Sequence, residues 1–190
     1  GTRPARTLAR TREVAGVEGP AGWFCPSGSP APTACSPGTV QPHAEQSRCE
    51  VCEAGAFMNE TGATACFDCP TGSYCEPGSS VPLPCEAGAF GNATNLISEE
   101  ACLPCPLGHF CVTGATEPEP CPAGTYGASQ GLGSAQCSGP CAKGHFCPAN
   151  STSSTQQPCP PGTFNSALGG TDSDACQPCG KGAFCASAST

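Results

Sequence analysis

The sequence predicts small disulfide-rich repeats that form an extended rod of short β-hairpins and turns, with little or no helix. Cysteine supplies 19 of the 190 residues, beside 25 Gly and 22 Pro. This density is typical of chains that need cross-links because they bury too little apolar surface to fold on a core alone. One short phrase also recurs along the chain, and no long stretch shows the apolar spacing of a helix.

The recurring phrase has the pattern C-x-x-G-x-[FY]. Two imperfect copies come first, one at Cys35, where Val40 takes the aromatic position, and one at Gly19, where the leading cysteine is missing. Complete copies are found at Cys52, Cys69, Cys85, Cys105, Cys121, Cys141, Cys159 and Cys179.

Each residue type in the phrase has a physical reason. Glycine at the fourth position suits a tight turn that needs positive φ or a close backbone approach. The aromatic residue supplies a large apolar surface in each complete copy. We therefore expect a string of small clusters, each a ring stacked on a disulfide, and hence a rod.

We call the span from one copy of the phrase to the next a half-repeat. In a short half-repeat, such as that from Cys69, the phrase runs straight into a second cysteine; in a long one, such as that from Cys85, a longer loop intervenes. The predicted organisation is an arginine-rich N-terminal arm at 1–18, first repeats with an extra half-repeat at 19–68, repeats at 69–104, 105–140 and 141–178, and a truncated half-repeat at 179–190 that looks cut from a longer array.

Metal binding is the alternative reading of the cysteines. Four C-x-x-C pairs, at 49/52, 66/69, 102/105 and 176/179, have the spacing of zinc ribbons. A zinc site needs four ligands around one ion, whereas these cysteines recur singly and evenly. A redox C-x-x-C would need a βαβ context, which the sequence does not show. We therefore expect disulfides in an extracellular protein, with no metal or cofactor.

The extra half-repeat suggests a pairing. It adds two cysteines without disturbing the half-repeats after it, so a bond closed within it is the simplest choice, although other phases of pairing also survive the insertion. By repetition the predicted bonds are Cys35–Cys49, Cys52–Cys66, Cys69–Cys75, Cys85–Cys102, Cys105–Cys111, Cys121–Cys137, Cys141–Cys147, Cys159–Cys176 and Cys179–Cys185.

Cys25 is left over, because Gly19 replaces its expected partner. An odd cysteine in a secreted chain suggests pairing with another chain or with a segment not present here. A buried free thiol is the other reading, and the sequence leaves both open.

Charge is unevenly distributed along the chain. The net charge is −8, yet Arg3, Arg6, Arg10 and Arg12 precede the first acidic residue, and from Glu13 onward 3 basic residues face 15 acidic ones, a balance of −12. The negative charge of the chain from Glu13 onward argues against nucleic acid or anionic lipid as a partner. No apolar run approaches the roughly 20 residues of a membrane span. We expect the arm to dock on an acidic neighbouring subunit.

Other marks also fit a secreted, non-enzymatic chain. The sequons at Asn59, Asn92 and Asn150 predict N-linked glycans, the first two in the same register two residues after the aromatic. Proline-rich connectors would carry O-linked glycans as well if the source is algal.

His109 and His145 share one phrase position and read as repeat variants, and Asp172 with Asp174 provides too few oxygen ligands for calcium. No catalytic arrangement is discernible, so we expect no enzyme.

The segments CPAGTYG, CEAGAF and CPLGHFC resemble the ephrin-receptor-like cysteine-rich repeat, a distant relative of tumour-necrosis-factor-receptor modules. The resemblance covers residues 19–185; the missing cysteine at Gly19 and the extra residue in CSGPC depart from it. It implies extended, disulfide-bonded extracellular modules, with a bond of the Cys85–Cys102 type. Similar arrays occur in algal and protist surface proteins such as the mastigoneme shaft protein. We expect a glycosylated structural protein that assembles with itself into a filament or a flagellar or cell-coat appendage, or else a receptor's stalk or ligand-binding region.

Overall fold

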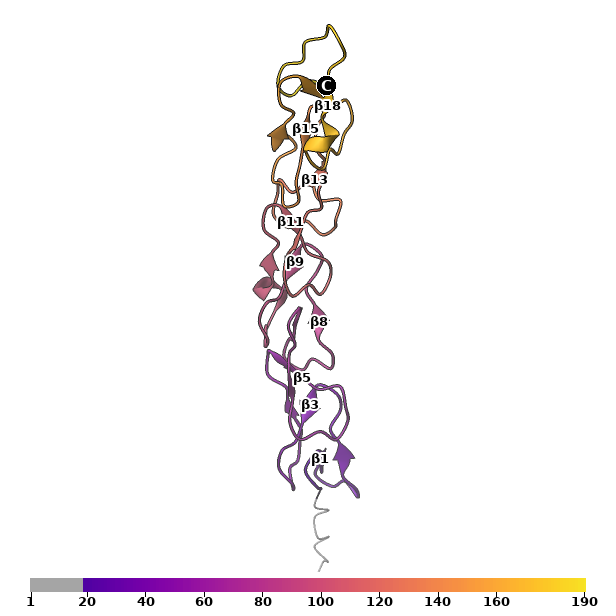
Figure 1. Ribbon diagram of the computed structural model, residues 1–190. Coiled ribbons are helices and arrows are strands. Elements are labelled where there is room, and N and C mark those ends of the chain that lie inside the picture. The colour runs from indigo at the N-terminus through magenta and orange to yellow at the C-terminus, as the bar shows by residue number, and fades with distance from the viewer. Residues whose placement is uncertain (1–18) are drawn as a thin grey trace, which may run out of the picture.

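A row of small hairpins makes up the described part of the chain. The structure, a computed structural model, describes residues 19–190, so the arginine-rich arm lies outside the described residues. Figure 1 shows the hairpins following one another along a narrow molecule, from β1 near one end to β18 near the other. Two-stranded antiparallel sheets and nine disulfides confirm the predicted class of small disulfide-rich repeats of β-hairpins.

Every described strand is two residues long. The first strand of each hairpin holds the fifth and sixth residues of a phrase, and the second ends just before the next phrase. The pairs are β1 (Trp23–Phe24) with β2 (Thr33–Ala34), β3 (Thr39–Val40) with β4 (Glu50–Val51), β5 (Ala56–Phe57) with β6 (Phe67–Asp68), β7 (Ser73–Tyr74) with β8 (Leu83–Pro84), β9 (Ala89–Phe90) with β10 (Leu103–Pro104), β11 (His109–Phe110) with β12 (Glu119–Pro120), β13 (Thr125–Tyr126) with β14 (Gly139–Pro140), β15 (His145–Phe146) with β16 (Gln157–Pro158), and β17 (Thr163–Phe164) with β18 (Gln177–Pro178). Two 3-10 turns, η1 (Glu99–Ala101) and η2 (Ser173–Ala175), lie in the loops of the β9/β10 and β17/β18 hairpins.

The phrase glycine forms the turn that opens each hairpin. In nine of the ten copies the fifth residue's N–H donates to the second residue's carbonyl at 3.0 to 3.2 Å, which closes a four-residue turn. The glycine is the third residue of that turn and has φ between 73° and 98° in all ten copies. Positive φ at this place defines a type II turn, so the sequence's preference for glycine is explained.

Consecutive half-repeats are joined by the same four backbone hydrogen bonds at each of nine junctions. At the junction after Cys69, Gly72 accepts from the Cys85 N–H at 2.9 Å and donates to the Gly91 carbonyl at 2.8 Å. Cys75 donates to Leu96, and the Cys69 carbonyl accepts from Asn95, both at 2.9 Å. The backbone groups that a two-residue strand leaves unpaired are thus satisfied by the next half-repeat.

The phrase glycines also contact the half-repeat two steps further along. A Cβ atom added to Gly88 would clash with the carbonyl of Gly131, and at Gly124 it would lie 2.7 Å from the carbonyl oxygen of Gly169. Eight of the ten glycines have such a neighbour closer than 3.0 Å, whereas Gly162 and Gly182 have none within 4 Å. The sequence suggested positive φ or a close approach, and at eight of the ten copies the structure requires both.

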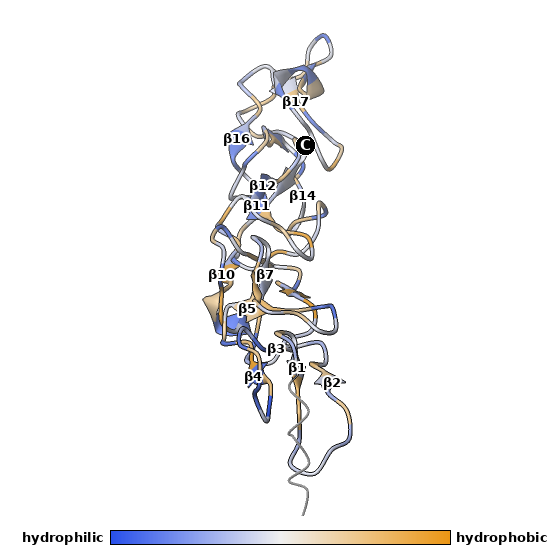
Figure 2. Ribbon diagram, turned by 90° about the horizontal axis from the view of Figure 1, so that it is seen from below, coloured by the Kyte–Doolittle hydropathy of each residue, from blue (hydrophilic) through white to orange (hydrophobic). Residues whose placement is uncertain are grey.

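The most buried side chains of the rod are cysteines. Twelve of them are among the buried apolar residues, and ten of these twelve have no exposed surface. The phrase aromatics are mostly half-buried, with Phe110 at 7% exposed and Phe184 at 91%. Figure 2 shows apolar segments spread along the whole length. The sequence predicts a ring stacked on a disulfide in each cluster, and the structure shows that the cysteines are the buried part while most of the rings are only half-buried.

The extra residue in CSGPC is absorbed locally. Cys137 takes a positive φ of 50°, and Ser138 donates from its backbone N–H to the Tyr126 carbonyl at 2.8 Å. The Ser138 hydroxyl in turn accepts from the Ala128 N–H at 2.9 Å. The β13/β14 pairing and the bond from Cys121 to Cys137 are consequently both kept.

Candidate functional site

The nine disulfides join the same nine pairs that the extra half-repeat suggested. Short half-repeats close loops with a sequence separation of 6, and long ones close loops of 14 to 17. Their Cα atoms are 5.6 to 6.3 Å apart, in the ordinary range for disulfides. Every C-x-x-C cysteine is thus bonded to a cysteine outside its own C-x-x-C pair, and within residues 19–190 no group of three or more His, Cys, Asp or Glu could hold a metal.

Cys25 is the one free cysteine of the described residues, and it is partly exposed. It lies beside Gly19, at the position that pairs with the first phrase cysteine in every other short half-repeat. Because Cys25 as a whole residue is partly exposed, pairing with another chain stays open.

The three sequon asparagines are all exposed, but they differ in backbone setting. Asn59 and Asn92 come two residues after the phrase aromatic, on half-repeats that contact each other through Gly55 and Asn95. Asn150 instead lies at a loop corner with φ 64°, and its side-chain oxygen packs against Gly108. The first two sequons are therefore equivalent, and the third also has a packing role.

The histidines and the aspartate pair have structural roles. The Nδ1 atoms of His109 and His145 lie 3.0 and 2.9 Å from the carbonyls of Leu107 and Lys143, the same contact in two half-repeats. Asp172 caps η2 by accepting from the Asp174 N–H at 2.9 Å. These contacts explain the residues as repeat variants and as a cap.

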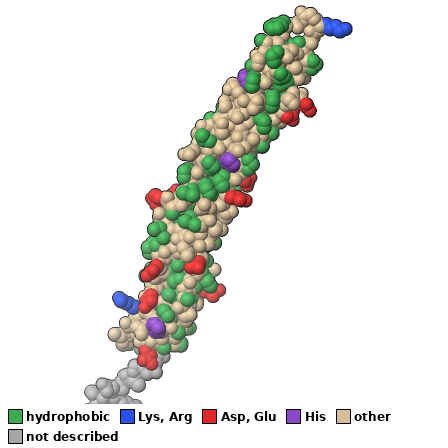
Figure 3. Space-filling view, turned by 60° about the vertical axis from the view of Figure 1, so that its left-hand side comes forward, with side chains coloured by type: hydrophobic (Ala, Val, Ile, Leu, Met, Phe, Trp, Pro, Cys, Tyr) green, Lys and Arg blue, Asp and Glu red, His purple; other side chains and the backbone are tan. Residues whose placement is uncertain are grey.

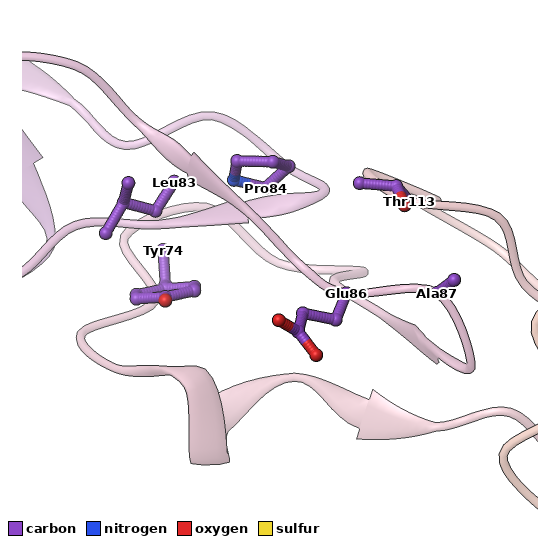
Figure 4. Close-up of a pocket in the computed structure, with 6 residues that line it drawn as sticks. All are labelled: Tyr74, Leu83, Pro84, Glu86, Ala87 and Thr113. Atoms are coloured by element: carbon purple, nitrogen blue, oxygen red, sulfur yellow. The ribbon is translucent and has the colours of Figure 1, made fainter.

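A shallow cavity of about 500 Å³ lies where three consecutive half-repeats meet. Its lining comes from β7, β8, the turn before β9 and the loop after β11, and consists of Tyr74, Leu83, Pro84, Glu86, Ala87 and Thr113. Figure 4 shows the Tyr74 ring below Leu83 and Pro84, with the Glu86 carboxylate directed toward it. A second cavity of about 270 Å³ shares Leu83 and extends to Glu76 and Val81. We call the two together the Tyr74 hollow.

Four carboxylates act on Tyr74, and two of them, those of Glu86 and Glu76, line the hollow. The pKa of Tyr74 is raised above its ordinary value by desolvation and then by the negative charges of Glu99, Glu76, Glu86 and Glu100. Hydrogen bonds from the Ser98 hydroxyl and from its own backbone N–H lower the pKa of Glu100. The hollow therefore has an apolar floor and a rim that is negatively charged at neutral pH.

The hollow lies in a segment that is both acidic and apolar at its surface. Residues 45–119 hold 11 acidic residues against Arg48 alone, a balance of −10, whereas residues 120–190 hold two of each sign. Figure 3 shows basic side chains near the two ends of the visible face and acidic ones between them. Among residues 19–190, eight of the eleven exposed large hydrophobic residues fall in the same segment: Val51, Phe67, Val81, Leu83, Ile97, Leu103, Leu107 and Val112. We call residues 45–119 the acidic segment.

Sequence reasoning did not find the Tyr74 hollow. Its lining comes from half-repeats that are adjacent in sequence, but the acidic residues stand alone or in a single pair, and no short motif contains them. The signal that could have shown it is the distribution of charge, because the half-repeats between Arg48 and residue 119 contain acidic residues and no basic one.

No protein-family model matches the chain, and a search of curated proteins gives no match. Within residues 19–190 there is no helix of the length and apolarity that crossing a bilayer requires.

Proposed function

We propose that the chain is an extracellular structural protein, a glycosylated array of ephrin-receptor-like repeats that assembles with itself into a filament or surface appendage. The observation that supports the proposal best is the set of four backbone hydrogen bonds repeated at each of nine junctions. An array with identical junctions can be lengthened by adding copies, without any change to the fold of each copy. A spacer or shaft requires that property.

Cross-linking supports the same role. Nine disulfides in loops of 6 to 17 residues hold every half-repeat from Cys35 onward, so the local structure does not depend on a large core. Disulfides of this density persist in oxidising surroundings outside the cytosol. Exposed sequons at Asn59 and Asn92 would add a sugar coat that increases solubility.

Electron microscopy of non-reduced material with its glycans intact tests this function. Filaments or large regular oligomers, shortened when residues 1–12 are removed, are the expected result. Discrete thin monomers at all concentrations would contradict it.

A second candidate is the stalk or ligand-recognition part of a cell-surface receptor. The Tyr74 hollow favours it, because an apolar floor with a charged rim is a plausible contact for a soluble partner. Monomeric rods in the micrographs would lead to this reading.

A further inference from the structure

We propose that the Tyr74 hollow binds the arginine-rich segment 1–12 from a second copy of this chain. The docking rests on the proposed self-assembly, for which it supplies the contact between copies. It assigns a partner to a surface that combines acidic charge, exposed apolar side chains and a concave shape.

Charge complementarity is the first argument. Residues 1–12 contain four arginines and no acidic residue, a balance of +4, and the acidic segment has a balance of −10. Outside the arm, the only basic residues are Arg48, Lys143 and Lys181. The arm is therefore the part of the chain whose charge best matches the hollow's rim, and guanidinium groups can bind carboxylates in a two-point geometry.

The apolar floor provides the second argument. Leu8 is the one large apolar residue of segment 1–12, and it lies two residues from both Arg6 and Arg10. In an extended peptide these three side chains share a face. Leu8 would then cover Tyr74 and Leu83, while Arg6 and Arg10 reach carboxylates on either side of the floor.

The number of carboxylates near Tyr74 suits a peptide with two or more cations. Glu76, Glu86, Glu99 and Glu100 come from the loop after β7, the turn before β9, and η1, and all four raise the pKa of Tyr74. All four side chains belong to exposed residues, so the arm can reach them without unfolding a hairpin. Isolated surface charge pairs bind weakly, whereas several on one apolar patch act together.

Charge reversal in the oxidised full-length chain tests the docking. The arm variant carries Arg6→Glu and Arg10→Glu, and the hollow variant carries Glu86→Arg and Glu99→Arg. The matched control carries Glu50→Arg and Glu53→Arg, two exposed residues of the acidic segment that belong to earlier half-repeats. Self-association is measured by sedimentation velocity, after intact mass has shown nine disulfides in each variant.

We expect the arm and hollow variants each to weaken self-association at least tenfold, the control to change it less than threefold, and the chain carrying both reversals to recover it. If the wild-type chain assembles and the hollow variant does too, the docking site is wrong and the structural role stands. An equal loss of self-association in the control would show that the effect comes from the overall charge of the acidic segment, and would overturn the docking at the hollow. A wild-type chain that never associates contradicts both proposals.

A photo-cross-linker at position 8 separates a second copy from the same copy. Benzoylphenylalanine in place of Leu8 is expected to give dimers joined to the peptide that contains Tyr74 and Leu83, with a yield that rises with concentration. Monomers cross-linked internally, at a yield independent of concentration, would overturn docking between copies.

Discussion

A Cβ atom added to Gly19 would stand 3.0 Å from the Sγ atom of Cys25. This is the separation of a Cβ and the partner sulfur across a disulfide. The other short half-repeats join these two positions by a bond. The first half-repeat therefore keeps the geometry of a disulfide although it has lost one of the two cysteines.

Gly19→Cys is expected to form a tenth disulfide with Cys25. Thiol labelling under denaturing, non-reducing conditions should find one reactive thiol in the monomeric wild-type chain and none in the variant. Gly19→Ala is the control, because it adds the Cβ without the sulfur and should leave one thiol. Two labelled thiols in Gly19→Cys would show that the first half-repeat does not have the shape of the later ones.

The two requirements on the phrase glycine can be separated by a matched pair of variants. Gly124 and Gly162 have φ of 87° and 86°, but only Gly124 has a carbonyl oxygen in the path of a Cβ, that of Gly169. Gly162→Ala should cost about 1 to 2 kcal/mol, from left-handed backbone alone. Gly124→Ala should cost more, since the half-repeat two steps along must also shift.

Hydrogen exchange measures this difference locally, because an array of repeats need not unfold in one step. The amide of Cys141 donates to Gly124, and that of Cys179 donates to Gly162. The loss of protection at the Cys141 amide in Gly124→Ala should be at least tenfold greater than the loss at the Cys179 amide in Gly162→Ala. Equal losses would mean that the close approach carries no energetic weight.

The glycans are expected to differ between the three sequons. Asn59 and Asn92 lie in equivalent exposed loops, whereas the Asn150 side chain packs on Gly108 and its neighbour Ser151 is buried. The packing of its side-chain oxygen on Gly108 restricts the orientation of the Asn150 amide, so occupancy at Asn59 and Asn92 should exceed that at Asn150. Glycopeptide mass spectrometry of secreted material measures all three, and highest occupancy at Asn150 would contradict the expectation.

The repeat pattern predicted more of this protein than a globular sequence usually allows. Since each half-repeat from Cys35 to Cys179 is a separate example of one local structure, the added pair Cys52 and Cys66 was enough to suggest the bonding of all the others. Hairpins and turns could be expected from the glycine and the spacing. These features depend on residues within one half-repeat, and residues of the same types recur in every half-repeat.

Relations across half-repeats could not be predicted in the same way. The sequence marks Gly88 as special but does not say that Gly131 lies against it, because the contact skips one half-repeat. Likewise Glu76 and Glu99 surround one tyrosine only because loops of neighbouring half-repeats are brought together by backbone bonds such as that from Cys75 to Leu96. The partial burial of the phrase aromatics likewise depends on how consecutive hairpins pack, which the sequence does not specify.

The Tyr74 phenol should report the electric field of the hollow. Desolvation and the negative charges of Glu99, Glu76, Glu86 and Glu100 disfavour the phenolate, so its pKa lies above the ordinary value of about 10. The native chain then keeps a proton that the unfolded chain has released. The free energy of unfolding should therefore fall as the pH rises from the pKa of Tyr74 in the unfolded chain to its higher pKa in the native chain. Below that range it should not depend on the ionisation of Tyr74.

Ultraviolet titration of the wild-type chain against Tyr74→Phe isolates this phenol from Tyr126. Its midpoint should return to about 10 in denaturant and should fall in Glu99→Gln, which removes the largest of the four charge contributions. Half-molar salt should lower it as well, through screening. Docking of another copy's arm would act on this midpoint in two opposing directions, because two arginines oppose those carboxylates while cover by Leu8 adds desolvation. A midpoint below 10 in the dissociated chain would contradict the acidic rim itself.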